Sequence, residues 1–95
     1  MSFFVYMLAS RRNGPLYSGM TDYLVGRVWQ HRKGVVPGFT RKYSVKLLVW
    51  FETHESREAA IKRERHLNKW NRAWELKLIE QMNATWRDLF DELSP

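Results

Sequence analysis

Residues 3–19 read FFVYMLASRRNGPLYSG, two apolar segments separated by a short polar stretch. Successive side chains of a strand point to opposite faces, and residues 3–9 supply large apolar or aromatic side chains to both faces. Asn13, Gly14 and Pro15 are typical of a tight turn, because Asn and Gly tolerate the left-handed backbone that such turns require. The stretch therefore predicts an antiparallel hairpin with strands at residues 3–9 and 16–19.

The middle of the chain predicts a helix, a loop and a third strand. Thr21 and Asp22 are typical of the N-cap region of a helix that runs to about Lys33, and Gly34 is suited to follow its end. Residues 35–44 contain Pro, Gly and a mixture of basic and aromatic side chains, which indicates a loop. Residues 45–52 are rich in β-branched and aromatic side chains over the usual length of a strand.

The last third of the chain predicts helices. Ser56 is the expected N-cap of a helix over residues 56–68, and Asn71 of a helix over residues 72–82. Thr85 and Asp88 are spaced as in a capping box, with Asp in place of Glu or Gln, so we expect a final helical turn that ends at about Leu93. The element order is β-β-α-β-α-α plus this turn. It predicts a single α+β domain over residues 1–95, with a small, mostly antiparallel three-stranded sheet flanked by three helices.

Composition and charge narrow the class of protein. The 95 residues are 44% apolar, enough for a modest core, and the absence of cysteine excludes disulfides and cysteine-based zinc sites. The longest apolar segment near the N-terminus, residues 3–9, is too short to cross a membrane, so we expect no membrane partner. The absence of cysteine suits a reducing cytoplasm, where we expect the protein to act. The net charge of +6 favours a polyanionic partner, and nucleic acid is the first choice.

Glu64 is the most unusual residue of the predicted third helix, because its spacing places a carboxylate on the apolar stripe formed by Ala60, Ile61 and Leu67. A carboxylate in such a position must be paired, protonated or bound to a metal. One carboxylate suits Mg²⁺ or Mn²⁺, which keep most of their waters. An ion pair with Arg27 is the alternative that needs no metal.

The predicted hairpin and first helix supply the other groups that phosphodiester hydrolysis needs. Tyr6 and Tyr17 can face one another across the hairpin, and adjacent cations would favour a phenolate that activates water. Arg27 can clamp a phosphate with its planar guanidinium, and His31 lies one helical turn further on. The alternatives are a core tyrosine at position 6 and a buried, hydrogen-bonded histidine at position 31.

This ordered set of motifs resembles the GIY-YIG nuclease superfamily, specifically its small single-domain bacterial, UPF0213-like proteins. The matching segments are Val5-Tyr6-Met7, Tyr17-Ser18-Gly19, Arg27 with His31, Arg63-Glu64-Arg65, KWNRAW at residues 69–74 and NATWRDL at residues 83–89. The resemblance covers nearly the whole chain. Met7 and Ser18 replace isoleucines of the namesake triplets, and Met20 stands where some relatives have a lysine.

The resemblance implies a small sheet flanked by helices and divalent-metal-dependent cleavage of DNA. It carries over an active-site set of five residues, with Glu64 as the metal ligand. These residues are Tyr6, Tyr17, Arg27, His31 and Glu64. One tyrosine would assist the attacking water, and the sequence does not distinguish between the two. Since Met20 is not basic, Arg41 or Lys42 would supply the missing cation.

Basic and aromatic side chains outside this set predict a nucleic-acid-binding surface, because cations between aromatic rings can follow a phosphate backbone. The candidates are Arg11, Arg12, Arg32, Lys33, Arg41, Lys42 and Tyr43. The leading hypothesis is an endonuclease with little sequence preference that acts on DNA in repair or recombination. The DNA can be structured or damaged, and a monomer is the favoured oligomeric state. There are two alternatives. One is a catalytically silent nucleic-acid-binding module, and the other is an adaptor that binds a protein partner through its aromatic C-terminal segment. The sequence does not distinguish DNA from RNA as the nucleic acid.

Overall fold

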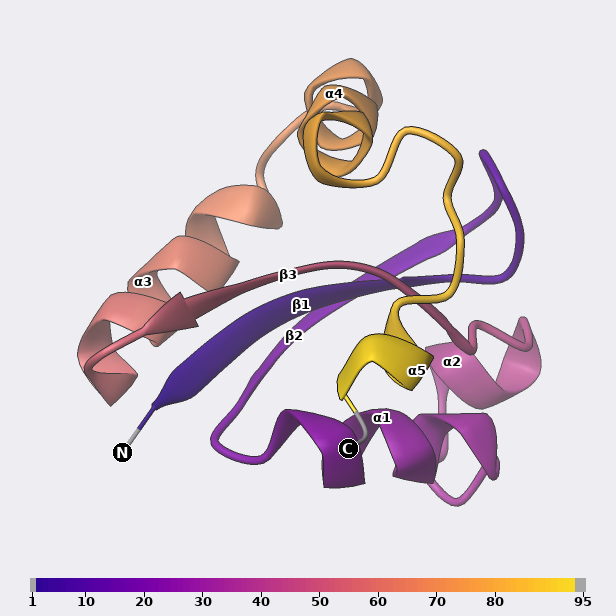
Figure 1. Cartoon of the computed structure of the whole chain (residues 1–95), viewed down its shortest axis with the longest axis horizontal. Coiled ribbons are helices and arrows are strands. Elements are labelled where there is room, and N and C mark those ends of the chain that lie inside the picture. The colour runs from indigo at the N-terminus through magenta and orange to yellow at the C-terminus, as the bar shows by residue number, and fades with distance from the viewer. Residues whose placement is uncertain (1, 94–95) are drawn as a thin grey trace.

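The computed structural model describes residues 2–93 and contains one three-stranded sheet with helices on both faces (Figure 1). The strands are β1 (Phe3–Ala9), β2 (Leu16–Thr21) and β3 (Leu47–His54), and the helices are α1 (Leu24–Arg32), α2 (Phe39–Lys42), α3 (Arg57–Leu67), α4 (Arg72–Met82) and α5 (Phe90–Leu93). The strand order is β2-β1-β3 and both pairings are antiparallel, which confirms the predicted α+β class. Within residues 2–93, every helix is too short or too polar to cross a bilayer.

The central strand β1 divides the core into two layers. Val5 and Met7 pack on the face covered by α3 and α4, whereas Tyr6 and Leu8 pack on the face covered by α1 and α5. All four side chains are at most 1% exposed. The alternation expected for residues 3–9 is therefore confirmed, and it explains why both sets of side chains in this strand are apolar or aromatic.

The register of the hairpin places both candidate tyrosines on one face. Tyr6 is paired with Gly19, and Leu8 is paired with Tyr17. Because side chains alternate along a strand, Tyr6 and Tyr17 both point toward α1. Ser18 points to the opposite face, toward α3.

The start of α1 differs from the prediction. Thr21 belongs to β2, where it is paired with Phe4, and the helix begins at Leu24 after Tyr23, without a side-chain cap. The predicted cap at Thr21 and Asp22 is wrong, because pairing with β1 extends the strand through Thr21. In contrast, the caps of the next two long helices are confirmed. The Ser56 hydroxyl accepts a hydrogen bond from the Ala59 amide at 3.1 Å, and the Asn71 side chain accepts one from the Trp74 amide at 3.0 Å.

Two further boundaries differ from the sequence-based expectation. Residues 35–44 are not all loop, since they contain the short helix α2, and the third strand is shifted toward the C-terminus by two residues. The final helical turn, α5, begins at Phe90, whose amide donates to Asp88 Oδ1 at 3.0 Å. Asp88 therefore caps this turn in place of Thr85, and its Oδ1 also accepts from the Leu48 amide at 3.1 Å, which ties the turn to β3.

Candidate active site

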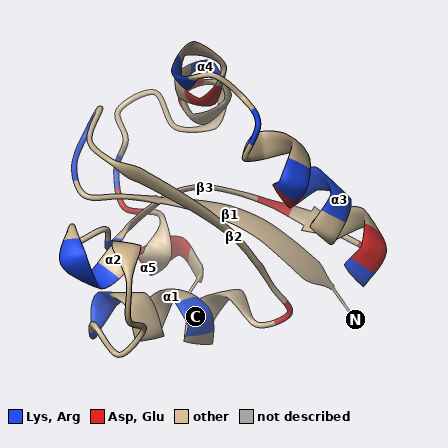
Figure 2. Ribbon diagram, turned by 180° about the vertical axis from the view of Figure 1, so that it is seen from behind, with Lys and Arg blue, Asp and Glu red and all other residues tan. Residues whose placement is uncertain are grey.

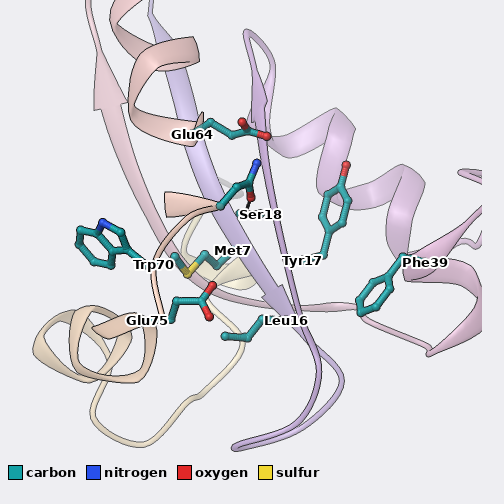
Figure 3. Close-up of a pocket in the computed structure, with 9 residues that line it drawn as sticks. Met7, Leu16, Tyr17, Ser18, Phe39, Glu64, Trp70 and Glu75 are labelled. Carbon is teal, nitrogen blue, oxygen red and sulfur yellow. Dashed lines mark hydrogen bonds between the residues drawn. The ribbon is translucent and has the colours of Figure 1, made fainter. Parts of the chain in front are cut away.

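Tyr17 and Glu64 line the same open cavity, which has a volume of about 460 Å³. Tyr17 comes from β2 and Glu64 from α3, and both side chains are half-buried. Figure 3 shows the Glu64 carboxylate extended toward the side of β2 on which Tyr17 lies. The fold thus brings together an acid and a phenol that are 47 residues apart in the sequence, and leaves both open to a ligand.

The Tyr6 hydroxyl and the His31 ring form a buried pair behind this cavity. The Tyr6 oxygen lies 3.3 Å from His31 Nε2, and both side chains are 1% exposed. The Tyr17 ring packs against the pair, with its centroid 5.2 Å from that of His31 and 6.4 Å from that of Tyr6. The expected cluster of two tyrosines and one histidine is therefore present, with Tyr17 on its solvent side.

His31 is neutral at pH 7, because burial and, to a smaller extent, the Arg27 charge lower its pKa from 6.5 to about 4. Its other nitrogen, Nδ1, lies 2.9 Å from the hydroxyl of Thr40 on α2. A neutral imidazole has one N–H donor and one acceptor nitrogen. If Nδ1 donates to Thr40, Nε2 is free to accept the Tyr6 proton.

The pKa of Tyr6 moves opposite to the expected direction. Burial raises it from 10.0 to about 12, and the nearby Tyr17 adds to the rise. The Arg27 guanidinium lowers this pKa, whereas the Glu64 carboxylate raises it. The prediction that adjacent cations favour a phenolate is therefore wrong for Tyr6, because burial outweighs the charge of Arg27.

Arg27 and Glu64 are not paired with one another. Within residues 2–93, Glu64 forms no ion pair or side-chain hydrogen bond, and Arg27 donates to the Gln30 side chain at 3.1 Å. Arg27 lies on the surface of α1, where it lines a second cavity of about 340 Å³ together with Tyr23 and Trp29. The metal-free alternative for Glu64, an ion pair with Arg27, is thus not adopted.

The donor set at the cavity fits a hard divalent cation held by few protein ligands. Among residues 2–93, no group of three or more His, Cys, Asp and Glu side chains is arranged to hold a metal. Glu64 instead offers a carboxylate at the wall of an open cavity, and no other residue of the described part of the chain pairs with it. Mg²⁺ is commonly held by one or two carboxylates, waters and substrate phosphate oxygens. Such an ion could use Glu64 in this way, whereas Zn²⁺ would require more protein ligands.

The predicted nucleic-acid-binding residues lie on three neighbouring segments at one end of the molecule. Figure 2 shows basic positions in the turn between β1 and β2, at the end of α1 and on α2. The residues are Arg11 and Arg12 in the turn, Arg32 and Lys33 on or just after α1, and Arg41, Lys42 and Tyr43 on or just after α2. Arg32 differs from the others, because it forms an ion pair with Asp88 and lies 4.8 Å from the centroid of the Phe90 ring.

Several residues of the site were not singled out from the sequence. Thr40 holds His31, Phe39 lines the cavity beside Tyr17, and Ser18 donates to the Asn68 side chain at 2.6 Å next to Glu64. Phe39 and Thr40 lie in a segment predicted as loop, and Ser18 and Asn68 are 50 residues apart. The only sequence signal was the basic-aromatic composition of residues 39–43.

Comparisons with known proteins agree with this arrangement. The family model of the GIY-YIG catalytic domain matches residues 2–83. A UPF0213 protein of Staphylococcus aureus strain Mu3 is 31% identical over 80 residues, which cover 84% of this chain and 96% of the relative, and the protein of strain MW2 gives the same values.

A solved structure shares the fold. The solution NMR structure of UPF0213 protein BH0048 from Bacillus halodurans superimposes with a TM-score of 0.57 at 24% identity, and the match covers 93% of each chain. GIY-YIG domains are generally nucleases that use divalent metals. On the family match and the Staphylococcus relatives, the chain belongs to the GIY-YIG nuclease superfamily and, within it, to the small UPF0213-like group.

Proposed function

We propose that this protein is a divalent-metal-dependent endonuclease that hydrolyses phosphodiester bonds of DNA. The observation that carries the proposal is the shared cavity of Glu64 and Tyr17, backed by the buried Tyr6–His31 pair. Phosphodiester hydrolysis requires an activated water, a cation at the phosphate and stabilisation of developing negative charge. Tyr17 and Glu64 at the cavity would serve the first two requirements, and Arg27, which lines the neighbouring surface of α1, would serve the third.

Tyr17 is the tyrosine that we place next to the attacking water. Its side chain lines the cavity, whereas Tyr6 is 1% exposed and its hydroxyl is held by His31. Since the pKa of Tyr6 is raised to about 12, this hydroxyl stays protonated at neutral pH and serves as a hydrogen-bond donor. Tyr6 and His31 then hold Tyr17 in position by packing against its ring.

Arg27 and Glu64 supply the charged groups. The Arg27 guanidinium can hold a phosphate through two parallel hydrogen bonds. Glu64 would hold a Mg²⁺ or Mn²⁺ ion, with waters and phosphate oxygens as the other ligands. When bound, such an ion neutralises negative charge on the phosphate and the leaving oxygen.

We expect little intrinsic sequence preference. The basic side chains at the turn, α1 and α2 suit contacts with phosphates, which position a nucleic acid but do not identify its bases. We further propose that the protein recognises structured or damaged DNA and acts in repair or recombination. We also propose that it is cytoplasmic and monomeric, and that residues 1–95 act as a single domain. RNA is tested beside DNA as a substrate.

The test is nicking of a supercoiled plasmid in Mg²⁺ or Mn²⁺, compared with a chelator. Glu64→Ala and Glu64→Gln are expected to abolish cleavage and to leave DNA binding nearly unchanged. Glu58→Gln is the matched control, because Glu58 is an exposed acid on the same helix, away from the cavity. Full cleavage by Glu64→Ala would contradict the mechanism. Salt-sensitive binding without any metal-dependent cleavage would instead identify a silent binding module.

A further inference from the structure

Phe39 is an exposed aromatic residue in the wall of the candidate active-site cavity. Its side chain lines this cavity together with Tyr17 and Glu64, and 44% of the residue is exposed. Figure 3 shows the Phe39 ring on the same side of the cavity as Tyr17. A flat apolar surface is therefore open to a ligand that occupies the site.

The position of Phe39 is fixed by its neighbour in the chain. Thr40 is 2% exposed, and its hydroxyl lies 2.9 Å from Nδ1 of the buried His31. The Thr40 carbonyl also accepts a hydrogen bond from the Val45 amide at 2.9 Å. These two bonds anchor α2 to the core beneath the active site, so Phe39 is held at the cavity by the same histidine that contacts Tyr6.

The surroundings of Phe39 suit a nucleic acid. The Phe39 and Tyr43 rings pack against one another with centroids 4.8 Å apart, and both residues remain substantially exposed. Arg41 and Lys42 are exposed on the same short helix, and Lys42 Nζ lies 5.4 Å from the centroid of the Tyr43 ring. Aromatic rings next to cations are the combination that binds bases and phosphates of single strands.

We propose that Phe39 stacks on a nucleobase next to the scissile phosphate, and that the preferred substrate has an unpaired base at this position. This inference rests on the proposed function. In a duplex, the neighbouring base pairs cover both faces of each base, so a protein ring can stack only on a base that is at an end, in a single strand or displaced. Phe39 would thus select single-stranded, gapped or flapped DNA over continuous duplex.

The experiment measures binding separately from cleavage. In the Glu64→Gln background, affinities are measured for a single-stranded oligonucleotide, the matching duplex, and single strands with one abasic site moved stepwise along the sequence. Phe39→Ala is expected to weaken single-strand binding about ten-fold, the effect of losing one stacked base. Phe39→Trp is expected to retain the affinity. Trp74→Ala is the matched control, since Trp74 is an exposed aromatic residue on α4 outside this cavity.

The abasic scan decides whether the contact is stacking. An abasic site at one position of the single strand is expected to lower the affinity of the Glu64→Gln protein about ten-fold. The same abasic site should cause no further loss in Phe39→Ala, because the stacking contact is already missing there. Thermal unfolding and the NMR signals of His31 report whether α2 stays in place. Equal single-strand affinity of Phe39→Ala and Trp74→Ala overturns the inference, as does an abasic penalty that is unchanged by Phe39→Ala. Stacking without metal-dependent cleavage supports Phe39 as the residue that selects an unpaired base and rejects the proposed nuclease. Cleavage without any effect of Phe39 supports the nuclease and overturns the inference.

Discussion

Gly19 lies against the hydroxyl of Tyr6, its partner across the hairpin: a Cβ atom at Gly19 would be 2.6 Å from that oxygen and 2.8 Å from the ring carbon that bears it. Only a residue without a side chain permits this approach. The glycine of the Tyr17-Ser18-Gly19 segment is thus explained by Tyr6 of the Val5-Tyr6-Met7 segment, and Tyr6 in turn contacts His31.

Gly19→Ala is expected to displace Tyr6 from His31. Overpacking of a tight core contact costs about 1–3 kcal/mol, and we expect the free energy of unfolding in urea to fall by this amount. Cleavage should fall as well, since Tyr6 packs against Tyr17. Tyr6→Phe removes the closest atom, so in the Gly19→Ala background it should recover part of the lost stability. Strictly additive effects of the two substitutions would show that the approach is not the cause.

His31 is expected to make stability depend on pH between about 4 and 6.5. Its pKa is lowered to about 4 in the folded protein, compared with 6.5 when exposed. In this interval the unfolded state binds the proton and the folded state does not, so stability rises with pH. The contribution is complete above pH 6.5 and is lost as the pH falls toward 4, with a total of about 3 kcal/mol. Urea unfolding at a series of pH values measures it.

The control for this pH dependence is His31→Gln. It keeps a polar side chain but does not titrate, so the slope between pH 4 and 6.5 should flatten even if the variant is less stable throughout. His54 and His66 are unchanged in the comparison, and an identical slope in both proteins would exclude His31 as its source.

Thr40→Val is expected to reduce cleavage about ten-fold and to lower stability by about 1 kcal/mol, because the buried His31 nitrogen loses its partner. Thr40→Ser keeps the hydroxyl and should restore both. The ring-nitrogen chemical shifts of His31 report its tautomer directly. A mixture of tautomers in Thr40→Val, and one tautomer in Thr40→Ser, would identify Thr40 as a positioning residue. Unchanged shifts would leave it only a packing role.

Arg32 and Lys42 are expected to act differently although both are predicted to bind nucleic acid. Arg32 is paired with Asp88 and covers Phe90, so Arg32→Ala should lower stability by about 1 kcal/mol. Lys42 is exposed and forms no ion pair within residues 2–93, so Lys42→Ala should leave stability unchanged. It should reduce the dependence of DNA affinity on salt by about one charge. Equal salt slopes and equal stabilities of the two variants would contradict this division.

The sequence alone determined the elements whose signals are local. The strand at residues 3–9, the Asn13–Gly14 turn and the caps at Ser56 and Asn71 depend on neighbouring residues, and the structure confirms each cap and strand. The ordered motifs were likewise sufficient to identify the family, which the family match confirms. Helical spacing predicted Glu64 on an apolar stripe with Ala60, Ile61 and Leu67. The structure buries Ala60 and Leu67 but leaves Ile61 and Glu64 half-buried, with Glu64 at the wall of an open cavity.

Tertiary structure alone decided the properties that depend on distant residues. Pairing with Phe4 extends β2 through Thr21, and the contact between Thr40 and His31 anchors a helix in a segment predicted as loop. Burial raises the pKa of Tyr6 and leaves Tyr17 as the tyrosine at the cavity. Each of these outcomes depends on which groups the packing pairs together and which it leaves exposed to water. Both are set by contacts between segments far apart in the chain.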